Sequence, residues 1–327
     1  MAANLTQHLR GGKQVLQKLD AFSTLSPVVT RVLGQNPGSF TLNGTNTYLI
    51  GSGPKRILWD TGEGLEDYVE TLRKAMSEVG CTGLQAIVIS HWHFDHLGGV
   101  PSVVKAFSES ETSPVPVYKF IPEELEPSYG GEGAVTPYEI WPKDKFTPLG
   151  DGDVLRTEGA TLRVYLTPGH ANDHLVGVIE EEQSMLSADN VLGEGTGVFR
   201  DLTAYLASLQ RMKDLKPQKL YPGHGPVIED AIERIDAYVE HRMGRVRQVE
   251  GAMRDAGQEA ALTVEQITRA VYPSDLDPKL FGPAMYNTVN VLTYLSSEKR
   301  AEKTGPEPKE PFTQQWKLCL SASASGL

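Results

Sequence analysis

The chain has 327 residues and a formal net charge of −11, with 31 Lys and Arg residues against 42 Asp and Glu residues. A composition of 39% hydrophobic and 22% charged residues is typical of a folded globular protein and excludes an intrinsically disordered chain. The negative charge argues against broad electrostatic binding of nucleic acid, although it leaves room for a local basic patch. The length suits one large domain, or one domain with an appendage.

Only two cysteines are present, Cys81 and Cys319, so neither a disulfide framework nor a CxxC metal pair is expected. The longest apolar runs, such as AIVI at 86–89, are too short to cross a bilayer. The first residues lack an apolar core of signal-peptide length. We therefore expect a cytoplasmic protein that does not contact a membrane.

The N-terminal half predicts strands and helices in turn. Residues 1–25 are polar and mixed, which favours a short helix leading into the fold. Strands ending in glycine turns are predicted next, at 26–34, 45–53 and 56–62. Apolar residues at helical spacing predict an amphipathic helix over 65–80, and the segment LQAIVIS that follows predicts a buried strand over 84–90.

Further along, a helix is expected over 101–107, and the stretch 108–150, rich in Pro, Gly and Glu, is expected to form loops and short strands. Strands with turns are predicted at 161–170, 174–180, 183–190 and 219–228, with a helix at 202–215.

The pattern changes near residue 229. Helical periodicity covers 229–257, 263–272 and 284–300, and the second of these opens with a Thr-x-x-Gln capping pattern. The segment EPKEPFTQQWKLCL favours a further strand. We therefore expect a β-rich catalytic domain at 1–228 and a helical appendage at 229–327.

The segment SHWHFDHLGGV at 90–100 holds three of the eight histidines in the chain. His91, His93 and Asp95 alternate, so that in an extended segment their side chains point the same way, and His96 follows them. Neutral imidazole and carboxylate are good ligands for zinc and related metals. Gly98 and Gly99 allow a tight turn beneath such a site.

Three more residues of ligand type follow predicted strands: His170 in TPGH, Asp189 in LSADN and His224 in YPGHG. Taken singly, each fits a hydrogen-bonded core histidine or a turn aspartate as well as a ligand. Taken together with the histidine cluster, they complete two coordination spheres at strand ends, where a sheet can hold them rigidly.

This order of ligands, His-x-His-x-Asp-His followed by a distant His, an Asp and a final His, resembles the metallo-β-lactamase superfamily over about residues 26–228. The resemblance implies an α/β fold, a four-layer αββα sandwich, with two divalent metal ions at one edge. Zinc is expected, with manganese or iron as alternatives. The first ion is expected on His91, His93 and His170, and the second on Asp95, His96 and His224. Asp189 is expected to bridge them, and Asp60 in LWDTG to support the ligands from behind.

Two metal ions of this kind activate water for attack on a carbonyl or phosphorus centre. Asp95 is the expected catalytic residue, because it can orient the nucleophile and take or return a proton.

Segments 36–53, 57–64 and 188–209 resemble one branch of the superfamily. The branch holds β-lactamase-like-2 endoribonucleases and the thioesterases that work beside fungal non-reducing polyketide synthases, and it carries a helical, winged-helix-like C-terminal appendage. We expect a thioesterase that releases an aromatic polyketide of the atrochrysone carboxylic acid type from an acyl carrier protein in secondary metabolism. The main alternative is a metal-dependent endoribonuclease, in which nucleic acid would be the substrate. A hydrolase of small glutathione thioesters and a metal-stabilised scaffold without turnover are less favoured.

Several residues remain open. Ala171 stands where the branch often has threonine, and His174 fits either a core role or one that faces the ligands or substrate. Trp92 and Phe199 fit the core better than a substrate pocket. Arg242, Arg245 and Arg247 fit a solvated helix face better than a docking face for an acidic carrier protein.

Overall fold

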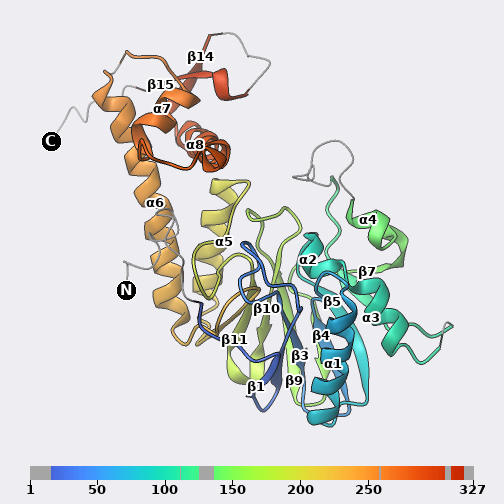
Figure 1. Ribbon diagram of the computed structural model, residues 1–327. Coiled ribbons are helices and arrows are strands. Elements are labelled where there is room, and N and C mark those ends of the chain that lie inside the picture. The colour runs from blue at the N-terminus through green and yellow to red at the C-terminus, as the bar shows by residue number, and fades with distance from the viewer. Residues whose placement is uncertain (1–15, 111, 125–135, 258, 306–310, 320–327) are drawn as a thin grey trace. The chain divides into compact units, whose positions relative to one another are not determined.

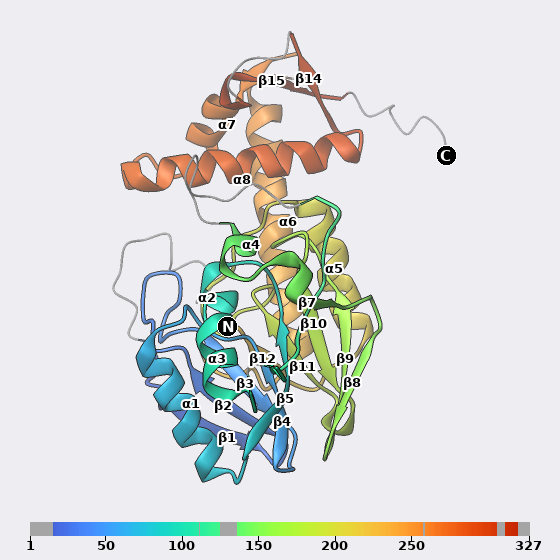
Figure 2. The same ribbon diagram turned by 90° about the vertical axis from the view of Figure 1, so that its right-hand side faces the viewer.

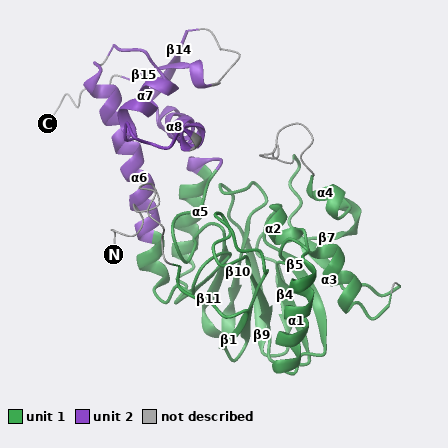
Figure 3. Ribbon diagram, viewed as in Figure 1, with its two compact units in different colours: residues 1–8, 12–199, 204–235 green, residues 9–11, 200–203, 236–327 purple. Residues whose placement is uncertain are grey.

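The computed structural model describes residues 16–110, 112–124, 136–257, 259–305 and 311–319. These residues form two compact units (Figure 3). One takes the described residues up to 199 together with 204–235, and the other takes 200–203 and those from 236 onward. The division falls inside helix α6 (Ala231–Asp255), and the boundary placed after residue 228 remains a proposal.

The first sheet has seven strands, which pair in the order in which they occur in the chain. They are β1 (Phe22–Ser26), β2 (Val29–Leu33), β3 (Asn46–Ile50), β4 (Lys55–Trp59), β5 (Gly83–Ile89), β6 (Val117–Lys119) and β7 (Phe146–Pro148). Pairings are antiparallel from β1 to β4 and parallel from β4 to β7. Because β5 lies between two parallel neighbours and is covered on both faces along its last four residues, these residues, AIVI at 86–89, form a continuous apolar run.

The second sheet has five strands in the order β12-β11-β10-β9-β8. Their bounds are β8 (Val154–Thr157), β9 (Ala160–Leu166), β10 (Leu175–Ile179), β11 (Ser184–Ala188) and β12 (Leu220–Pro222). Strands β9, β10 and β11 pair antiparallel, and β11 and β12 pair parallel. The carboxyl ends of β9, β11 and β12 therefore lie at one edge of this sheet.

The two sheets pack face to face between helices (Figures 1 and 2). Helices α1 (Glu66–Glu78) and α3 (Val100–Phe107) cover the outer face of the first sheet, where Leu72 and Val103 pack with Ile87 and Ile89. Side chains on the opposite face, such as Val88, pack with those of the second sheet. Helix α5 (Leu202–Asp214) lies on the other side of the second sheet, and the Arg211 guanidinium stacks over the ring of Tyr165 in β9. The predicted αββα sandwich is confirmed.

Two expectations for the connecting segments were incomplete. The predicted N-terminal helix lies partly in residues 1–15, outside the described residues, and residues 22–26 form the edge strand β1. Residues 108–150 contain β6 and β7 but also short helical turns, which are α4 (Pro137–Ile140) and η2 (Lys143–Lys145). Pro137 opens α4, and its ring presets a helical φ angle. A stretch rich in proline can therefore still contain a helical turn. Another short turn, η3 (Glu180–Glu182), joins β10 to β11.

The second unit follows the order α6, β13 (Leu262–Thr263), α7 (Val264–Val271), α8 (Pro278–Ser297), β14 (Ala301–Thr304), η4 (Pro311–Thr313) and β15 (Gln315–Leu318). Its three strands form a sheet in the order β13-β15-β14, which is the winged-helix-like arrangement expected for the appendage. Thr263 caps α7 with the predicted box, since its side chain accepts from Gln266 N while the Gln266 side chain accepts from Thr263 N. None of the helices in the described part of the chain is long and apolar enough to cross a membrane.

Candidate metal centre

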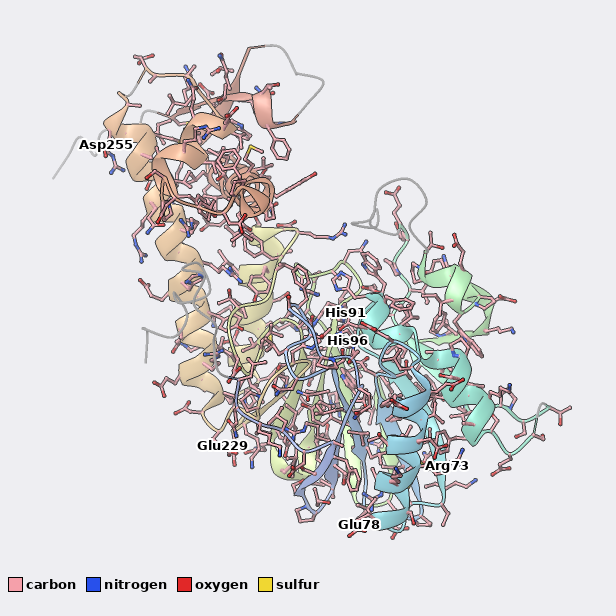
Figure 4. The ribbon with its side chains drawn as sticks, in the orientation of Figure 1. Arg73, Glu78, His91, His96, Glu229 and Asp255 are labelled. Carbon is pink, nitrogen blue, oxygen red and sulfur yellow. The ribbon has the colours of Figure 1, made fainter. Side chains whose placement is uncertain are left out.

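The residues predicted to bind metal all follow the carboxyl ends of strands. His91 comes just after β5, His170 after β9, Asp189 directly after β11 and His224 after β12. His91 and His96 lie at the end of the sandwich opposite to Arg73 and Glu78 of α1 (Figure 4). The hydrogen-bonded ladder of each sheet thus fixes where each of these segments begins, and the two sheets bring the candidate ligands together at one edge.

The first group of side chains is formed by three histidines from two sheets. His91 Nε2 and His93 Nδ1 are 2.9 Å apart. His170 Nε2 lies 2.9 Å from His93 Nδ1 and 3.3 Å from His91 Nε2. On the far side of its ring, His170 Nδ1 lies 2.8 Å from the carbonyl oxygen of Val198, so this nitrogen carries the proton and Nε2 presents a lone pair to the group.

The second group contains Asp95, His96 and His224. Asp95 Oδ2 lies 3.2 Å from Nε2 of His96 and 3.2 Å from Nε2 of His224. Both imidazoles are buried, whereas a fifth of the Asp95 side chain is exposed. The carboxylate is therefore the member of this group that solvent can reach.

Asp189 lies between the two groups. Its Oδ1 is 3.4 Å from Nε2 of both His96 and His224, and its Oδ2 is 3.7 Å from Nε2 of His170. One carboxylate thus presents a separate oxygen to each group, which is the position that a bridging ligand requires.

Asp60 lies behind the second group at the end of β4. It accepts hydrogen bonds from Ser90 N and Ser90 Oγ, each at 2.8 Å, and its Oδ2 is 2.8 Å from His96 Nδ1. Because the carboxylate accepts the Nδ1 proton of His96, Nε2 is left free to face Asp95 and Asp189. Asp60 itself has a positive φ of 59°, a conformation that aspartate tolerates better than most residues.

The segment that carries the first four candidate ligands is not extended throughout. Residues Phe94–Leu97 form the short helix α2, so simple alternation does not describe Asp95 and His96. His91 and His93 precede the helix and join the first group, and the helical turn directs Asp95 and His96 to the second. Phe94, in the same turn, is 53% exposed.

Gly99 is required for space and not for an unusual turn. Its φ is −80°, which any residue can adopt. A Cβ atom there would lie 2.0 Å from the carbonyl oxygen of Thr61. The close approach lets Thr61 N and Thr61 Oγ1 both donate to the carbonyl oxygen of His96, at 2.8 and 2.9 Å.

The chemistry of these side chains fits bound cations. His96 Nε2 and Asp189 Oδ1 are buried and make no hydrogen bond, although they face one another. Such atoms are costly to bury unless a ligand satisfies them. A group of buried histidine nitrogens and carboxylate oxygens is the donor set of first-row divalent metals, and the cluster is therefore able to bind metal.

The pKa values of the histidines are shifted in ways that agree with metal binding. Burial first, and then the neighbouring imidazoles, hold the pKa of His91 and His93 well below the usual value, so both rings are neutral with a lone pair available. Burial also lowers the pKa of His224, but Asp189 and Asp95 outweigh it and raise this pKa to about 9. The second group therefore holds a proton that a cation would displace.

His174 takes a buried position between the segments that carry the candidate ligands. Its Nε2 accepts from the backbone N of Asp189 at 3.2 Å, and its Nδ1 lies 3.1 Å from Thr167 Oγ1. Burial lowers its pKa well below the usual value, so the ring is neutral. His174 therefore combines features of both roles left open by the sequence. It is fully buried, as a core histidine is, and its Nε2 also holds the backbone of Asp189, a candidate ligand.

A buried ion pair near the first group was missed by sequence reasoning. Lys119 in β6 and Asp173 pair directly, and both side chains are fully buried. Asp173 Oδ1 also accepts from the backbone N of Trp92, at 3.4 Å, between His91 and His93. The partners lie 54 residues apart in the chain, and neither has a spacing that would have predicted the contact.

The structure also shows the surroundings of the two aromatic residues and the three arginines left open by the sequence. Trp92 and Phe199 are both buried, and the Phe199 ring stacks on Tyr205 with centroids 5.5 Å apart, as expected for core residues. In the second unit, Arg242 is buried, Arg245 lies over the ring of Tyr272 at 4.1 Å, and exposed Arg247 pairs with Glu240. These three arginines therefore do not form one exposed basic face.

Comparison with known proteins gives a consistent result. The family model for the metallo-beta-lactamase superfamily matches residues 40–224. The chain is 39% identical to the beta-lactamase-like protein 2 homolog of Caenorhabditis elegans over 258 residues, which are 79% of this chain and 80% of that protein. It is 35% identical to the atrochrysone carboxyl ACP thioesterase dmxR1 of Cryptosporiopsis sp. over 280 residues, which are 83% and 80% of the two chains. Two Aspergillus proteins named atrochrysone carboxyl ACP thioesterase match at 34% and 36% identity.

Among solved structures, a beta-lactamase domain protein from Burkholderia ambifaria superposes with a TM-score of 0.74 at 17% identity. The match covers 91% of this chain and 93% of that chain. At this identity the likeness supports the fold alone.

Proposed function

This chain belongs to the metallo-β-lactamase superfamily of metal-dependent hydrolases, and we propose that it is a thioesterase acting on a carrier-bound polyketide. The substrate would be an aromatic polyketide thioester on the acyl carrier protein of a non-reducing polyketide synthase, released as an acid of the atrochrysone carboxylic acid type. The main support is the similarity, over about four-fifths of this chain, to fungal proteins named atrochrysone carboxyl ACP thioesterases.

The proposed ligand sets follow the two groups of side chains. His91, His93 and His170 would hold one cation, and Asp95, His96 and His224 a second. Asp189 would bridge them, because its two oxygens face different groups. Zinc suits this nitrogen-rich set, and manganese or iron would also be accepted.

Bound divalent cations would supply a nucleophile derived from water at neutral pH and a positive charge opposite the developing oxyanion. The protein would supply orientation and proton transfer. Burial raises the pKa of Asp95, but His96 and His224 more than offset this and hold the pKa well below its usual value. Asp95 is therefore ionised at neutral pH and can accept a hydrogen bond from the attacking water, which orients it.

The proposed reaction adds water across the thioester. The water oxygen forms a bond to the carbonyl carbon, and the carbon–sulfur bond breaks. The carrier-bound phosphopantetheine leaves as a thiol and the polyketide as a carboxylic acid. No covalent intermediate with the protein is needed, and no redox partner takes part.

Endonucleolytic cleavage of RNA is less well supported by the charges. The net charge of −11 opposes the binding of a polyanion. Of the α6 arginines considered above, Arg242 is buried, Arg245 is stacked and Arg247 is paired. An acidic carrier protein would also need a docking surface other than these arginines.

The deciding experiment offers both substrates to the purified protein loaded with Zn²⁺. An aromatic polyketide thioester on its carrier protein and a short single-stranded RNA are incubated in parallel, with Asp95→Ala as the inactive control. Release of the polyketide acid that is lost in Asp95→Ala supports the proposal. RNA cleavage without thioester release would overturn the proposed substrate.

A further inference from the structure

Asp95 receives a hydrogen bond from outside the proposed ligand sets. Thr45 Oγ1 donates to Asp95 Oδ2 at 2.9 Å. This is the same oxygen that lies 3.2 Å from Nε2 of His96 and of His224. Thr45 is fully buried, so water does not compete for the contact.

Asn36 sets the direction of this hydrogen bond. Its Oδ1 accepts from Thr45 N at 2.9 Å, which leaves Nδ2 to donate to Thr45 Oγ1 at 3.1 Å. An ionised carboxylate can only accept, and the amide Nδ2 can only donate. The Thr45 hydroxyl therefore accepts from Asn36 and must give its own proton to Asp95.

The same segment also holds the loop that carries His224. Thr45 and His224 form an isolated antiparallel bridge, in which Asn46 N donates to the carbonyl oxygen of Gly223 at 2.7 Å. The side-chain Nδ2 of Asn46 donates to the carbonyl oxygens of Pro222 and Gly225, at 2.9 and 2.8 Å. Two members of the second group are thus positioned from one short stretch of the first sheet.

We propose that Asn36 and Thr45 are positioning residues that fix the Asp95 carboxylate for the second metal ion. This proposal rests on the metal-dependent function proposed above, but not on the identity of the substrate. Thr45 acts by directing one oxygen of Asp95 towards His96 and His224, and Asn36 acts by making Thr45 a donor. Loss of a hydrogen-bond partner behind a metal ligand typically lowers metal affinity 10–100-fold.

The test measures Zn²⁺ binding to the metal-stripped full-length protein by competition with a chromogenic chelator, without any substrate. Thr45→Val keeps the shape of the side chain and removes the donor. Thr45→Ser keeps the donor. Thr47→Val is the matched control, because Thr47 is a buried threonine on β3 whose hydroxyl contacts Val32 O and Tyr68 OH and not the metal cluster.

For Thr45→Val we expect one of two Zn²⁺ affinities to fall about 10–100-fold while the other is unchanged. Thr45→Ser and Thr47→Val should retain both affinities. Asn36→Asp replaces the Nδ2 donor by an acceptor, so that the Thr45 hydroxyl turns away from Asp95, and it should weaken the same ion. If circular dichroism shows that Thr45→Val does not fold, the Zn²⁺ affinities of Asn36→Asp test the proposal on their own.

Unchanged affinities in Thr45→Val or Asn36→Asp would overturn the proposal, as would an equal loss in Thr47→Val. A wild-type protein that binds fewer than two Zn²⁺ ions would also overturn it. A wild-type protein that binds two Zn²⁺ ions but releases no polyketide would refute only the proposed substrate, because the affinities are measured without it.

Discussion

Oδ2 of Asp60 lies 2.8 Å from Nδ1 of His96, on the side of the imidazole ring that faces away from the metal cluster. Both side chains are fully buried. The contact links the end of β4 to the helical turn after β5, and it makes Nδ1 of His96 a donor, so that Nε2 is the nitrogen that faces the cluster. The second group of candidate ligands therefore depends on a residue that does not itself belong to the group.

Replacing Asp60 by asparagine tests this dependence. Asparagine tolerates the positive φ at this position, so the backbone is expected to keep its conformation. Its neutral amide is a weaker acceptor for His96 Nδ1–H and for the two Ser90 donors. We expect Asp60→Asn to lower Zn²⁺ affinity and turnover by about 10–100-fold. Asp214→Asn, an exposed carboxylate on α5, serves as the control, and an unchanged Zn²⁺ affinity in Asp60→Asn would contradict this role.

Asp95 is expected to act in the chemical step. In Asp95→Asn the side chain keeps its shape but loses the negative charge that orients water and takes up a proton. We expect kcat for thioester release to fall about 10²–10⁴-fold. Steady-state kinetics at saturating Zn²⁺ separate this effect from weaker metal binding, and a variant that retains wild-type kcat under those conditions would exclude Asp95 from the chemistry.

The buried pair of Lys119 and Asp173 is expected to contribute strongly to stability. Lys119→Met leaves a buried carboxylate without its partner, which typically costs about 3–5 kcal/mol of the free energy of unfolding. The double variant Lys119→Met/Asp173→Leu should recover most of this loss, but not all of it, because Trp92 N loses its acceptor. Urea unfolding measures both effects.

Lys55→Met is the matched control for this prediction. Lys55 pairs with Glu109 at 2.6 Å, but both side chains are more than half exposed. Loss of an exposed pair is expected to cost much less than loss of the buried pair, because water screens the charges in both the folded and the unfolded chain. Equal losses in Lys55→Met and Lys119→Met would show that burial of the second pair has no energetic consequence.

We expect His241 in α6 to make the free energy of unfolding depend on pH. Burial, and then the charges of Arg242 and Arg245, lower its pKa from 6.5 to about 4. Between these values the unfolded chain binds a proton that the folded chain does not. The contribution to stability is therefore complete above pH 6.5 and is lost as the pH falls towards 4.

His241→Gln should remove this part of the acid sensitivity. Because His241 is only partly buried, solvent screening reduces the effect to on the order of 1 kcal/mol. Urea unfolding at about pH 7 and about pH 5 compares the two proteins. An identical loss of stability in both would show that His241 does not titrate differently on folding.

Much of the fold could be predicted from local pattern. The apolar residues at 86–89 in β5 and the helical spacing in α1 reflect burial on defined faces, and both elements lie close to their predicted bounds. The capping box at Thr263 was visible because its two partners are three residues apart. The short helix α2 was not predicted, because four residues are too few to show a helical period.

The contacts that support the cluster could not be predicted from patterns of neighbouring residues in the sequence. Thr45 meets Asp95 across 50 residues, and Lys119 meets Asp173 across 54. Such contacts depend on how strands pair within a sheet, and the spacing of residues in the sequence does not indicate that pairing. The positions of the seven ligand-type residues were predicted, but their roles as metal ligands remain proposals.

The most direct test of the central proposal is to locate the metal. Crystals of the protein loaded with Zn²⁺ would give anomalous difference maps at the zinc edge. We expect two peaks, one among His91, His93 and His170 and the other among Asp95, His96 and His224. Asp189 should lie between them, with the peaks about 3.5–4 Å apart. A single peak, or peaks away from these side chains, would contradict the two-metal centre on which the proposed hydrolysis depends.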